Sequence, residues 1–219
     1  MNPITYLLSY IVGIPVEKQP SRISGKLEVW LQNGRYVLHS TAANYSFDTL
    51  HVVFQRTFRH IRVQHKNPAR VLVLGLGAGS IPAILYDELQ LQPEITGVEQ
   101  DEVVVQLAQK YFNIQRYKHL KVILDDAIRF MQCCAEKFDL VINDVFVHTD
   151  VPEAACQTNY LHKLVQCTAT GGTGLFNFIT ETPEQHKAFS QTERTLRSLS
   201  SKVEVFHASE VNAVLMWQG

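Results

Sequence analysis

The sequence has few cysteines and no surplus of charge of either sign. Its 4 cysteines form neither a CxxC metal-binding pair nor the dense spacing of a secreted disulfide scaffold, so we expect reduced thiols and a cytoplasmic protein. The 20 Lys and Arg residues nearly balance the 21 Asp and Glu residues, and no run is strongly basic. This charge pattern argues against a nucleic-acid partner and favours a small-molecule substrate.

Long apolar runs and clusters of metal ligands are also missing. The apolar N-terminal segment, residues 4–14, is well short of the roughly 20 residues that span a bilayer, and no basic residue precedes it as in a signal peptide. We therefore expect no membrane segment, and we interpret this run as an amphipathic element that packs on the protein or on a partner subunit. The 9 histidines are scattered without ligand spacing, so no metal site is expected.

What is present suits one hydrophobic core with a small extension. The chain has 219 residues, of which 46% are hydrophobic and 19% charged. Strand-like runs at 26–32 and 35–39 flank Asn33-Gly34, a dipeptide typical of tight hairpin turns. We predict a β-rich extension over residues 1–50 and a nucleotide-binding transferase domain over residues 51–219, entered through a helix at 49–62.

The larger part alternates short apolar runs with helical patterns. Five runs predict buried parallel strands at residues 71–74, 95–98, 121–124, 138–143 and 173–178. A Thr170-Gly171-Gly172 turn is expected to close the helix before the fifth strand. Two later runs, at 202–206 and 212–217, are a short loop apart and predict an antiparallel pair at the sheet edge. The fold class is therefore α/β, with a Rossmann-like, mostly parallel sheet, an antiparallel C-terminal edge pair and a small N-terminal β-hairpin extension.

The strongest chemical motif is a glycine loop directly after the first of these strands. Gly75, Gly77 and Gly79 form a G-x-G-x-G pattern, and Glu99 follows about 20 residues later at the end of the next strand. Such glycines let the backbone approach a nucleotide, and the acid can hold ribose hydroxyls. A dinucleotide fingerprint needs glycine or alanine where Ser80 stands, so a nucleoside without pyrophosphate is favoured over NAD.

Two further acids follow neighbouring strands and are expected at the same edge of the sheet. Asp126 either caps the helix that it precedes or recognises an adenine, or does both. Asp144 lies between apolar runs, which places its carboxylate in a partly desolvated cleft and makes it a candidate proton acceptor. Together with Glu99 these acids would favour a cationic ligand such as a sulfonium nucleoside.

Most of the chain resembles the spermidine synthases, the polyamine aminopropyltransferases of the class I AdoMet methyltransferase fold. The resemblance rests on four segments: residues 67–79 into the glycine loop, Gly97-Val-Glu99, Asp125-Asp-Ala127, and 138–144 ending at Asp144. It implies a seven-stranded sheet, a donor that is decarboxylated S-adenosylmethionine or S-adenosylmethionine, a small amine acceptor and a homodimer. It also implies Asp144 as the catalytic residue, with Asp126 and Ala127 at the adenine.

The sequence departs from the polyamine synthases at acidic residues that this family carries. Ala78 and Val147 stand where the family carries aspartates, and the family's Tyr-His-Glu segment falls near residues 53–55. Each buried ammonium without a counter-charge would cost several kcal/mol, so the acceptor need not be a polyamine. Asp150 and Glu153 are candidate replacement acids, and His148 is a candidate for the acceptor cleft.

Three hypotheses follow. The first is aminopropyl transfer from an S-adenosyl donor to a small amine. The second is a small-molecule methyltransferase on the same fold, which the missing acids favour. The third is a nucleotide-binding relative without catalytic activity.

Overall fold

A small antiparallel sheet forms the N-terminal part of the protein. The computed structural model describes residues 3–40, 44–46 and 49–219. The small sheet has the order β1-β2-β3-β4, with strands β1 (Ile14–Ser21), β2 (Gly25–Gln32), β3 (Arg35–Ser40) and β4 (Asn44–Ser46). Asn33 and Gly34 have φ angles of 48° and 73° between β2 and β3, which is the backbone that a tight primed turn requires. The predicted hairpin is therefore confirmed, with β1 and β4 added on either side of it.

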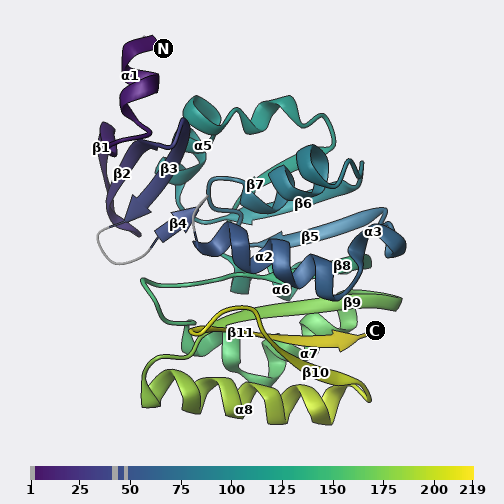
Figure 1. Cartoon of the computed structure of the whole chain (residues 1–219). Coiled ribbons are helices and arrows are strands. Elements are labelled where there is room, and N and C mark those ends of the chain that lie inside the picture. Colours follow the sequence, from purple (N-terminus) through teal and green to yellow (C-terminus); the bar gives the residue numbers. More distant parts are fainter. Residues whose placement is uncertain (1–2, 41–43, 47–48) are drawn as a thin grey trace.

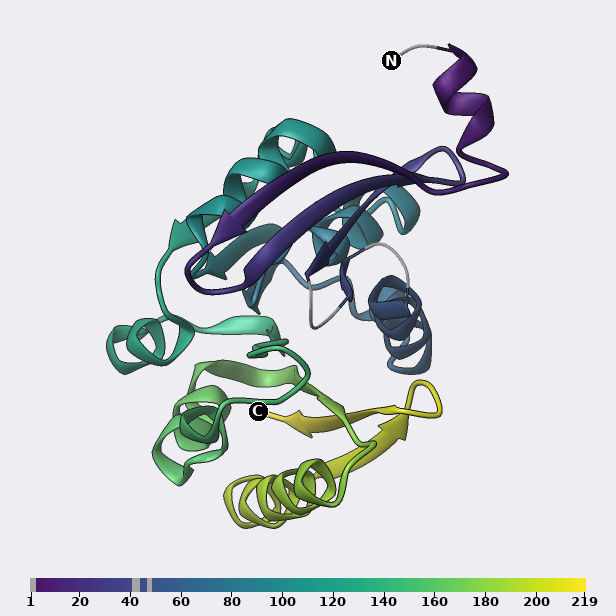
Figure 2. The ribbon, with the colours of Figure 1, turned by 90° about the vertical axis from the view of Figure 1, so that its left-hand side faces the viewer.

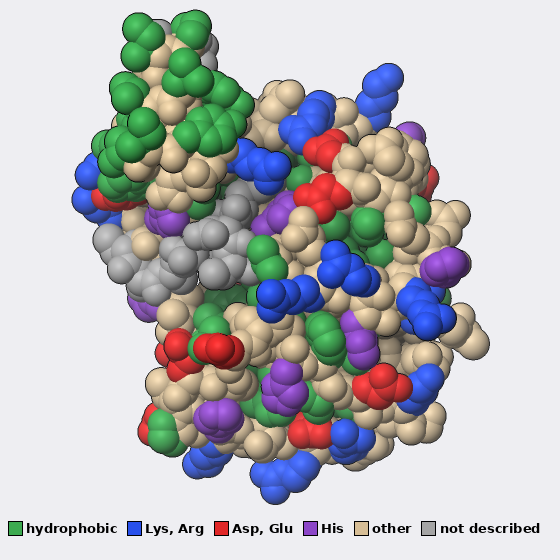
Figure 3. Space-filling model, in the orientation of Figure 1, with side chains coloured by type: hydrophobic (Ala, Val, Ile, Leu, Met, Phe, Trp, Pro, Cys, Tyr) green, Lys and Arg blue, Asp and Glu red, His purple; other side chains and the backbone are tan. Residues whose placement is uncertain are grey.

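The first helix, α1 (Pro3–Leu8), projects from the body of the protein (Figures 1 and 2). None of its residues is buried: Ile4 and Leu7 are 67% and 66% exposed, and Ile11, just after the helix, is 85% exposed. Apolar side chains gather at this end of the molecule (Figure 3). This segment is not part of either hydrophobic core, but the residue after the helix, Ser9, holds it to the β2–β3 turn: the Ser9 hydroxyl accepts from the Gly34 amide at 2.9 Å and its carbonyl from the Asn33 amide at 2.8 Å. None of the described helices has the length and apolar content needed to cross a bilayer.

The larger sheet has seven strands in the order β10-β11-β9-β8-β5-β6-β7. Its strands are β5 (Arg70–Leu74), β6 (Glu94–Glu99), β7 (Leu120–Leu124), β8 (Phe138–Asn143), β9 (Thr168–Ile179), β10 (Val203–His207) and β11 (Asn212–Gln218). The pairs among β5 to β9 are parallel, whereas β11 pairs antiparallel with β9 and with β10. The predicted α/β class, the parallel core and the antiparallel C-terminal edge pair are confirmed.

Helices cover both faces of this sheet. One core contains side chains from α2 (Thr49–His60), α4 (Ser80–Ala83), the π-helical turn η1 (Ile84–Glu88) and α5 (Glu102–Phe112). The opposite core contains side chains from α6 (Ala127–Cys133), α7 (Thr158–Cys167) and α8 (Pro183–Leu199). Short elements complete the chain: α3 (Val63–Lys66), η2 (Ile114–Arg116) and η3 (Glu153–Cys156). Strand β5 alternates between the cores, because Val71 and Val73 face the first and Leu72 and Leu74 the second.

The small sheet is tied to the main sheet through the start of α5. Asp101 is the N-cap of α5 and accepts from the Val103 amide at 2.9 Å. The same side chain accepts from the hydroxyls of Ser21 and Ser24, each at 2.5 Å. Figure 2 shows β1 and β2 lying along α5. These contacts cross the predicted domain boundary at residue 50, and the division itself stays a prediction.

One sequence expectation is wrong at the fifth parallel strand. The Thr170-Gly171-Gly172 segment does not form a turn that closes α7. The helix ends at Cys167, and β9 begins at once with Thr168. Gly171 has a φ of 78°, and the pairing of β8 with β9 shifts register between Phe138 and Leu140. The glycines therefore form an irregularity within the strand: β9 advances five residues, from Thr168 to Thr173, while β8 advances two, from Phe138 to Leu140, and the left-handed backbone of Gly171 lies among the three extra residues.

The strand order reverses at β5, which pairs with β6 on one side and with β8 on the other. The connections that leave the carboxyl ends of β5 and β8 consequently run to opposite faces of the sheet. In open α/β sheets such a point leaves a crevice in which ligands bind. The glycine loop follows β5 and Asp144 follows β8, so both lie at this crevice.

Candidate active site

The glycine loop passes very close to the backbone of Asp144. Gly75 has a φ of 83°, and a Cβ atom there would lie 2.3 Å from the Asp144 carbonyl oxygen. The Asp144 amide in turn donates to the carbonyl of Leu74 at 2.8 Å. No side chain fits between the two strand ends, so glycine at position 75 brings the loop and Asp144 together.

Substitution of Gly75 tests this close approach. We expect Gly75→Ala to lower the free energy of unfolding by at least about 2 kcal/mol, because strain at positive φ and a backbone clash act together. Gly171→Ala is the matched control: its φ is 78°, but no atom lies within 4 Å of the added Cβ. Urea unfolding of both variants measures the difference. Equal decreases in the free energy of unfolding would show that the clash with the Asp144 backbone does not contribute.

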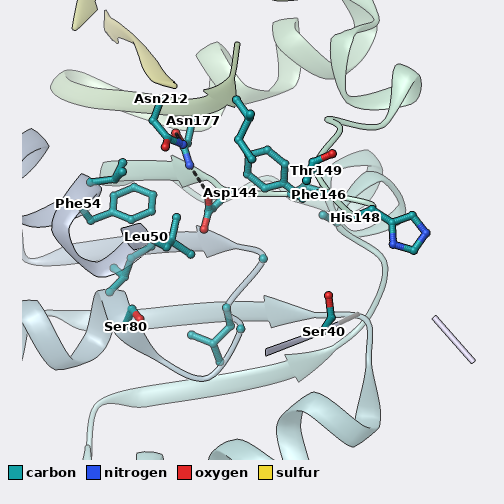
Figure 4. Close-up of a pocket in the computed structure, with 18 of the residues that line it drawn as sticks. Ser40, Leu50, Phe54, Ser80, Asp144, Phe146, His148, Thr149, Asn177 and Asn212 are labelled. Atoms are coloured by element: carbon teal, nitrogen blue, oxygen red, sulfur yellow. Dashed lines mark hydrogen bonds between the residues drawn. The ribbon is translucent and has the colours of Figure 1, made fainter. Parts of the chain in front are cut away.

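A cavity of about 910 Å³ opens at this crevice (Figure 4). The predicted residues that line it are Gly75, Gly77, Glu99, Asp126, Ala127 and Asp144. Gly79 is not among the lining residues; it is the N-cap of α4 with a φ of 91°. The structure thus brings together the three predicted acids and two of the three predicted glycines around one space.

Glu99 braces the glycine loop. Its carboxylate is only 6% exposed and accepts from three backbone amides: Gly77 at 2.9 Å, Gln100 at 2.9 Å and Asp101 at 3.0 Å. Burial raises the pKa of Glu99, and the hydrogen bonds from these amides oppose the rise. Oε1 accepts two of these bonds and Oε2 only one, so Oε2 retains capacity for a ligand hydroxyl.

Asp126 caps α6, as one of its two predicted roles requires. Its Oδ1 accepts from the Arg129 amide at 2.9 Å. The neighbouring Asp125 also lines the cavity and is paired with the Arg129 side chain. Capping occupies one carboxylate oxygen of Asp126, and the second role, adenine recognition, stays a prediction.

Asp144 is a buried acid of the cavity with a strongly raised pKa. It is 9% exposed, and one side chain among the described residues, Asn177, donates to it, at 3.0 Å. Burial raises the pKa of Asp144 from 3.8 to about 7; the Asn177 hydrogen bond opposes this, and the nearby charge of Glu99 adds to it. A carboxyl group that titrates near neutrality can accept a proton and release it again.

This raised pKa predicts a dependence of stability on pH. Between about pH 4 and 7 the unfolded carboxyl is charged while the folded one holds its proton, so the folded state binds more protons. The Asp144 contribution to stability is present below pH 4 and is lost as pH rises through about 7, a loss on the order of 4 kcal/mol. Urea unfolding of the wild type and Asp144→Asn across this range measures it. Parallel pH curves for the two proteins would contradict the shift.

Sequence reasoning missed two buried amides beside Asp144. Asn177 in β9 and Asn212 in β11 are 1% and 8% exposed, and both line the cavity. A signal was present, since Asn177 interrupts the apolar run Leu175-Phe-Asn-Phe-Ile179. An asparagine inside a buried strand needs hydrogen-bond partners there.

The two candidate replacement acids do not line the cavity. Asp150 and Glu153 are not among the lining residues; the Asp150 side chain accepts from Gln185 at 2.8 Å. Two exposed acids that were not predicted, Glu181 and Glu210, line the cavity instead. Their segments adjoin, because the Thr180 amide donates to the carbonyl of Val211 at 2.8 Å.

Ala78 and Val147, which stand where the family carries aspartates, do not line the cavity. Ala78 is fully buried in the core, and Val147 is 46% exposed and pairs with Asp150 through backbone bonds. His148 lines the cavity as predicted, although its ring points away from Asp144 in Figure 4. Among the described residues no three His, Cys, Asp or Glu side chains are grouped as metal ligands.

Aliphatic and aromatic side chains form much of the remaining wall. They come from α2 and from the strand ends: Leu50, Val53, Phe54, Phe146, Ile179 and Val211. Val53 and Phe54 fall on the segment where polyamine synthases carry Tyr-His-Glu. The part of the cavity wall next to α2 is therefore largely apolar.

Residues 35–210 match the family model described as the spermine/spermidine synthase domain. The polyamine aminopropyltransferase of Vibrio vulnificus is 29% identical over 135 residues, which cover 60% of this chain and 44% of that protein. The eEF1A lysine and N-terminal methyltransferase homolog of Drosophila melanogaster is 37% identical over 78 residues, covering 34% of this chain and 11% of that protein. The chain thus spans less than half the length of these relatives.

The fold is shared with solved structures. A probable spermidine synthase from Corynebacterium glutamicum superposes with a TM-score of 0.77 at 18% identity, covering 93% of this chain and 79% of that chain. A spermidine synthase in complex with a transition-state analogue superposes with a TM-score of 0.72 at 15% identity.

Proposed function

The chain belongs to the spermine/spermidine synthase family, and we propose that it is a transferase that moves an aminopropyl group from an S-adenosyl donor to a small amine. One observation carries the proposal: a buried acid with a pKa of about 7 shares a cavity with a glycine loop and two further acids. This arrangement combines a place for a cationic nucleoside with a group that can take a proton from an amine.

The donor would lie over the carboxyl ends of β5, β6 and β7. Gly75 and Gly77 have no side chains, so the donor can lie against the backbone of the loop. The Oε2 atom of Glu99 would accept from a ribose hydroxyl. Asp126 and the Ala127 amide, at the start of α6, would recognise the adenine. Carboxylates around a sulfonium are favourable electrostatically, whereas they would repel a pyrophosphate. Decarboxylated S-adenosylmethionine is the proposed donor, with S-adenosylmethionine as the other candidate; no metal takes part.

The chemistry is a displacement at the carbon next to sulfur. The amine nitrogen forms a bond to this carbon while the carbon–sulfur bond breaks, and the electron pair stays on sulfur as a neutral thioether. The product amine then carries an extra proton, or the attacking amine loses one beforehand. Because a free alkylamine has a pKa of about 10, a nearby acceptor must take that proton. Asp144 is the acceptor that we propose.

The small amine would occupy the part of the cavity next to Asp144 and α2, which we call the acceptor side. Its reacting nitrogen would lie at Asp144, and its carbon chain along the apolar wall of Val53, Phe54 and Ile179. Glu181 and Glu210 are the carboxylates available to a second ammonium, in place of the predicted Asp150 and Glu153.

Calorimetry and a product assay test the proposal. The purified protein is expected to bind methylthioadenosine, which is the part shared by both donors, and to form an aminopropylated amine only with decarboxylated S-adenosylmethionine. A panel of small mono- and diamines serves as acceptors. Methylated product with S-adenosylmethionine alone would identify a methyltransferase instead. Binding without any product would favour a relative without catalytic activity, and no binding of either donor or of methylthioadenosine would refute the S-adenosyl site.

We also propose a cytoplasmic homodimer that buries the exposed N-terminal segment. Ile4, Leu7, Ile11 and Val12 together expose an apolar surface that soluble monomers rarely leave uncovered. All four cysteines are free, as expected for a reducing compartment. Light scattering is expected to give a dimer mass for the wild type and a monomer mass for a Leu7→Ser/Ile11→Ser variant. A monomeric wild type would contradict this interface.

A further inference from the structure

A chain of hydrogen bonds between buried side chains ends at Asp144. The Nδ2 atom of Asn177 donates to Asp144 Oδ1 at 3.0 Å, the bond drawn in Figure 4. The Nδ2 atom of Asn212 donates to Asn177 Oδ1 at 3.2 Å, and the Ser209 hydroxyl donates to Asn212 Oδ1 at 3.1 Å. Asp144 directly after β8, Asn177 in β9 and Asn212 in β11 therefore form a line of polar side chains across three neighbouring strands.

Strand register places the two asparagines together. Asn177 lies opposite Val214, and Asn212 lies opposite Ile179, so the asparagines are diagonal neighbours on one face of the antiparallel pair. Ser209 belongs to the turn between β10 and β11, where it also accepts from the Asn212 amide at 2.9 Å. The line is thus anchored in the backbone of the edge hairpin.

The order of donors and acceptors gives the line a direction. A primary amide offers donors at one end and an acceptor at the other. Asn212 donates to the oxygen of Asn177, which holds the nitrogen of Asn177 toward Asp144. If the Asn177 amide turned over, its oxygen would face the carboxylate and its nitrogen would face the Asn212 donor. Because both asparagines are buried, water does not compensate for these lost bonds.

Among the described residues, none of the other charged groups around the cavity forms a hydrogen bond with Asp144. They are Arg56 on α2, Glu99 after β6, Asp125 and Asp126 after β7, Glu181 after β9 and Glu210 before β11. His148 follows in the loop after β8. Glu99 raises the pKa of Asp144, whereas the Asn177 hydrogen bond lowers it. The guanidinium of Arg56 donates to the Ala208 carbonyl at 2.9 Å.

We propose that Asn177 and Asn212 are positioning residues, which hold the Asp144 carboxyl in the orientation that receives the acceptor's proton. This inference rests on the proposed function of Asp144. Asn177 occupies Oδ1, and Oδ2 is the oxygen left for the amine proton: the N–H bond breaks, the O–H bond forms, and the electron pair stays on nitrogen. Asn212 acts one step further away, by fixing the amide of Asn177.

The test measures the titration of the Asp144 carboxyl directly, by NMR of protein labelled with 13C at aspartate Cγ. Asp144→Asn identifies the resonance. We expect Asn177→Leu to raise its titration midpoint by about 1 pH unit or more, because a hydrogen bond to the charged form is removed without loss of side-chain volume. Asn212→Leu is expected to raise it by less. Thr192→Val is the matched control, since Thr192 on α8 is fully buried but does not line the cavity.

Rates of aminopropyl transfer are then compared over the same pH range. The midpoint of the pH–rate profile is expected to follow the NMR midpoint, with kcat near pH 7 about tenfold lower in Asn177→Leu, recovery at higher pH, and unchanged affinity for methylthioadenosine. Asn177→Ser keeps a shorter hydrogen-bond donor, so its titration midpoint is expected to lie between those of the wild type and Asn177→Leu. A midpoint in Asn177→Leu equal to that of the wild type overturns the proposal. If Asn177→Leu does not fold, an unshifted Asn212→Leu overturns it. An NMR shift without a matching change in the pH–rate profile supports positioning but refutes Asp144 as the proton acceptor.

Discussion

An Asp144→Asn variant is expected to lose about 10²- to 10⁴-fold in kcat for aminopropyl transfer at neutral pH. The amide keeps the shape of the side chain but cannot take the proton of the amine. The proposed contacts of methylthioadenosine are with Glu99, Asp126 and the glycine loop, so the affinity for this compound should change little. The measurements are steady-state rates with decarboxylated S-adenosylmethionine and titration calorimetry with methylthioadenosine.

Asp150→Asn is the control for this substitution. Asp150 lies in the same loop, is exposed and does not line the cavity, so near-normal rates are expected. The same Asp144 variant should unfold with higher free energy than the wild type at pH 7 and above, because a buried charge is removed. If Asp144→Asn is as active as the wild type and no more stable, Asp144 is not the proton acceptor.

The second large effect is expected at Glu99, where stability and donor binding depend on one carboxylate. Glu99→Leu leaves the amides of Gly77, Gln100 and Asp101 without their acceptor. At about 1–3 kcal/mol for each buried unpaired donor, the free energy of unfolding should fall by at least 3 kcal/mol. Glu99→Gln keeps one acceptor oxygen and should lose less stability, while its affinity for methylthioadenosine falls about tenfold or more.

Glu102→Gln provides the comparison for Glu99. Glu102 is an exposed acid three residues later, at the first turn of α5, and its loss should change stability by less than about 1 kcal/mol. Urea unfolding and calorimetry separate the two effects. If Glu99→Gln binds methylthioadenosine as tightly as the wild type, Glu99 braces the loop without contacting the ribose.

The strands of the main sheet could be predicted because most coincide with short, largely apolar runs. The run at 71–74 is buried on both faces, and it matches β5 with one added residue at its start. The antiparallel edge pair was likewise visible as two runs separated by a short loop. The error at Thr170-Gly171-Gly172 arose because glycines serve helix ends and strand irregularities equally well; only the pairing with β8 distinguishes them.

The site could be predicted in part for a topological reason. Acids that follow parallel strands meet at one edge, so Glu99, Asp126 and Asp144 were expected together from their spacing along the chain, and they share the cavity. Their individual hydrogen bonds were not predictable. The ribose contact predicted for Glu99 stays a prediction, and the three backbone amides that donate to its carboxylate were not foreseen.

The sequence by itself determined the order of strands and helices, the glycine turn and the acids at the strand ends, because these depend on residues near one another in the chain. Tertiary structure alone decided which partners the acids have. Asn177 and Asn212 reach Asp144 through the register of β9 with β11 and the pairing of β8 with β9, contacts between residues more than 30 positions apart. Burial at that junction, rather than any local motif, moves the pKa of Asp144 to about 7.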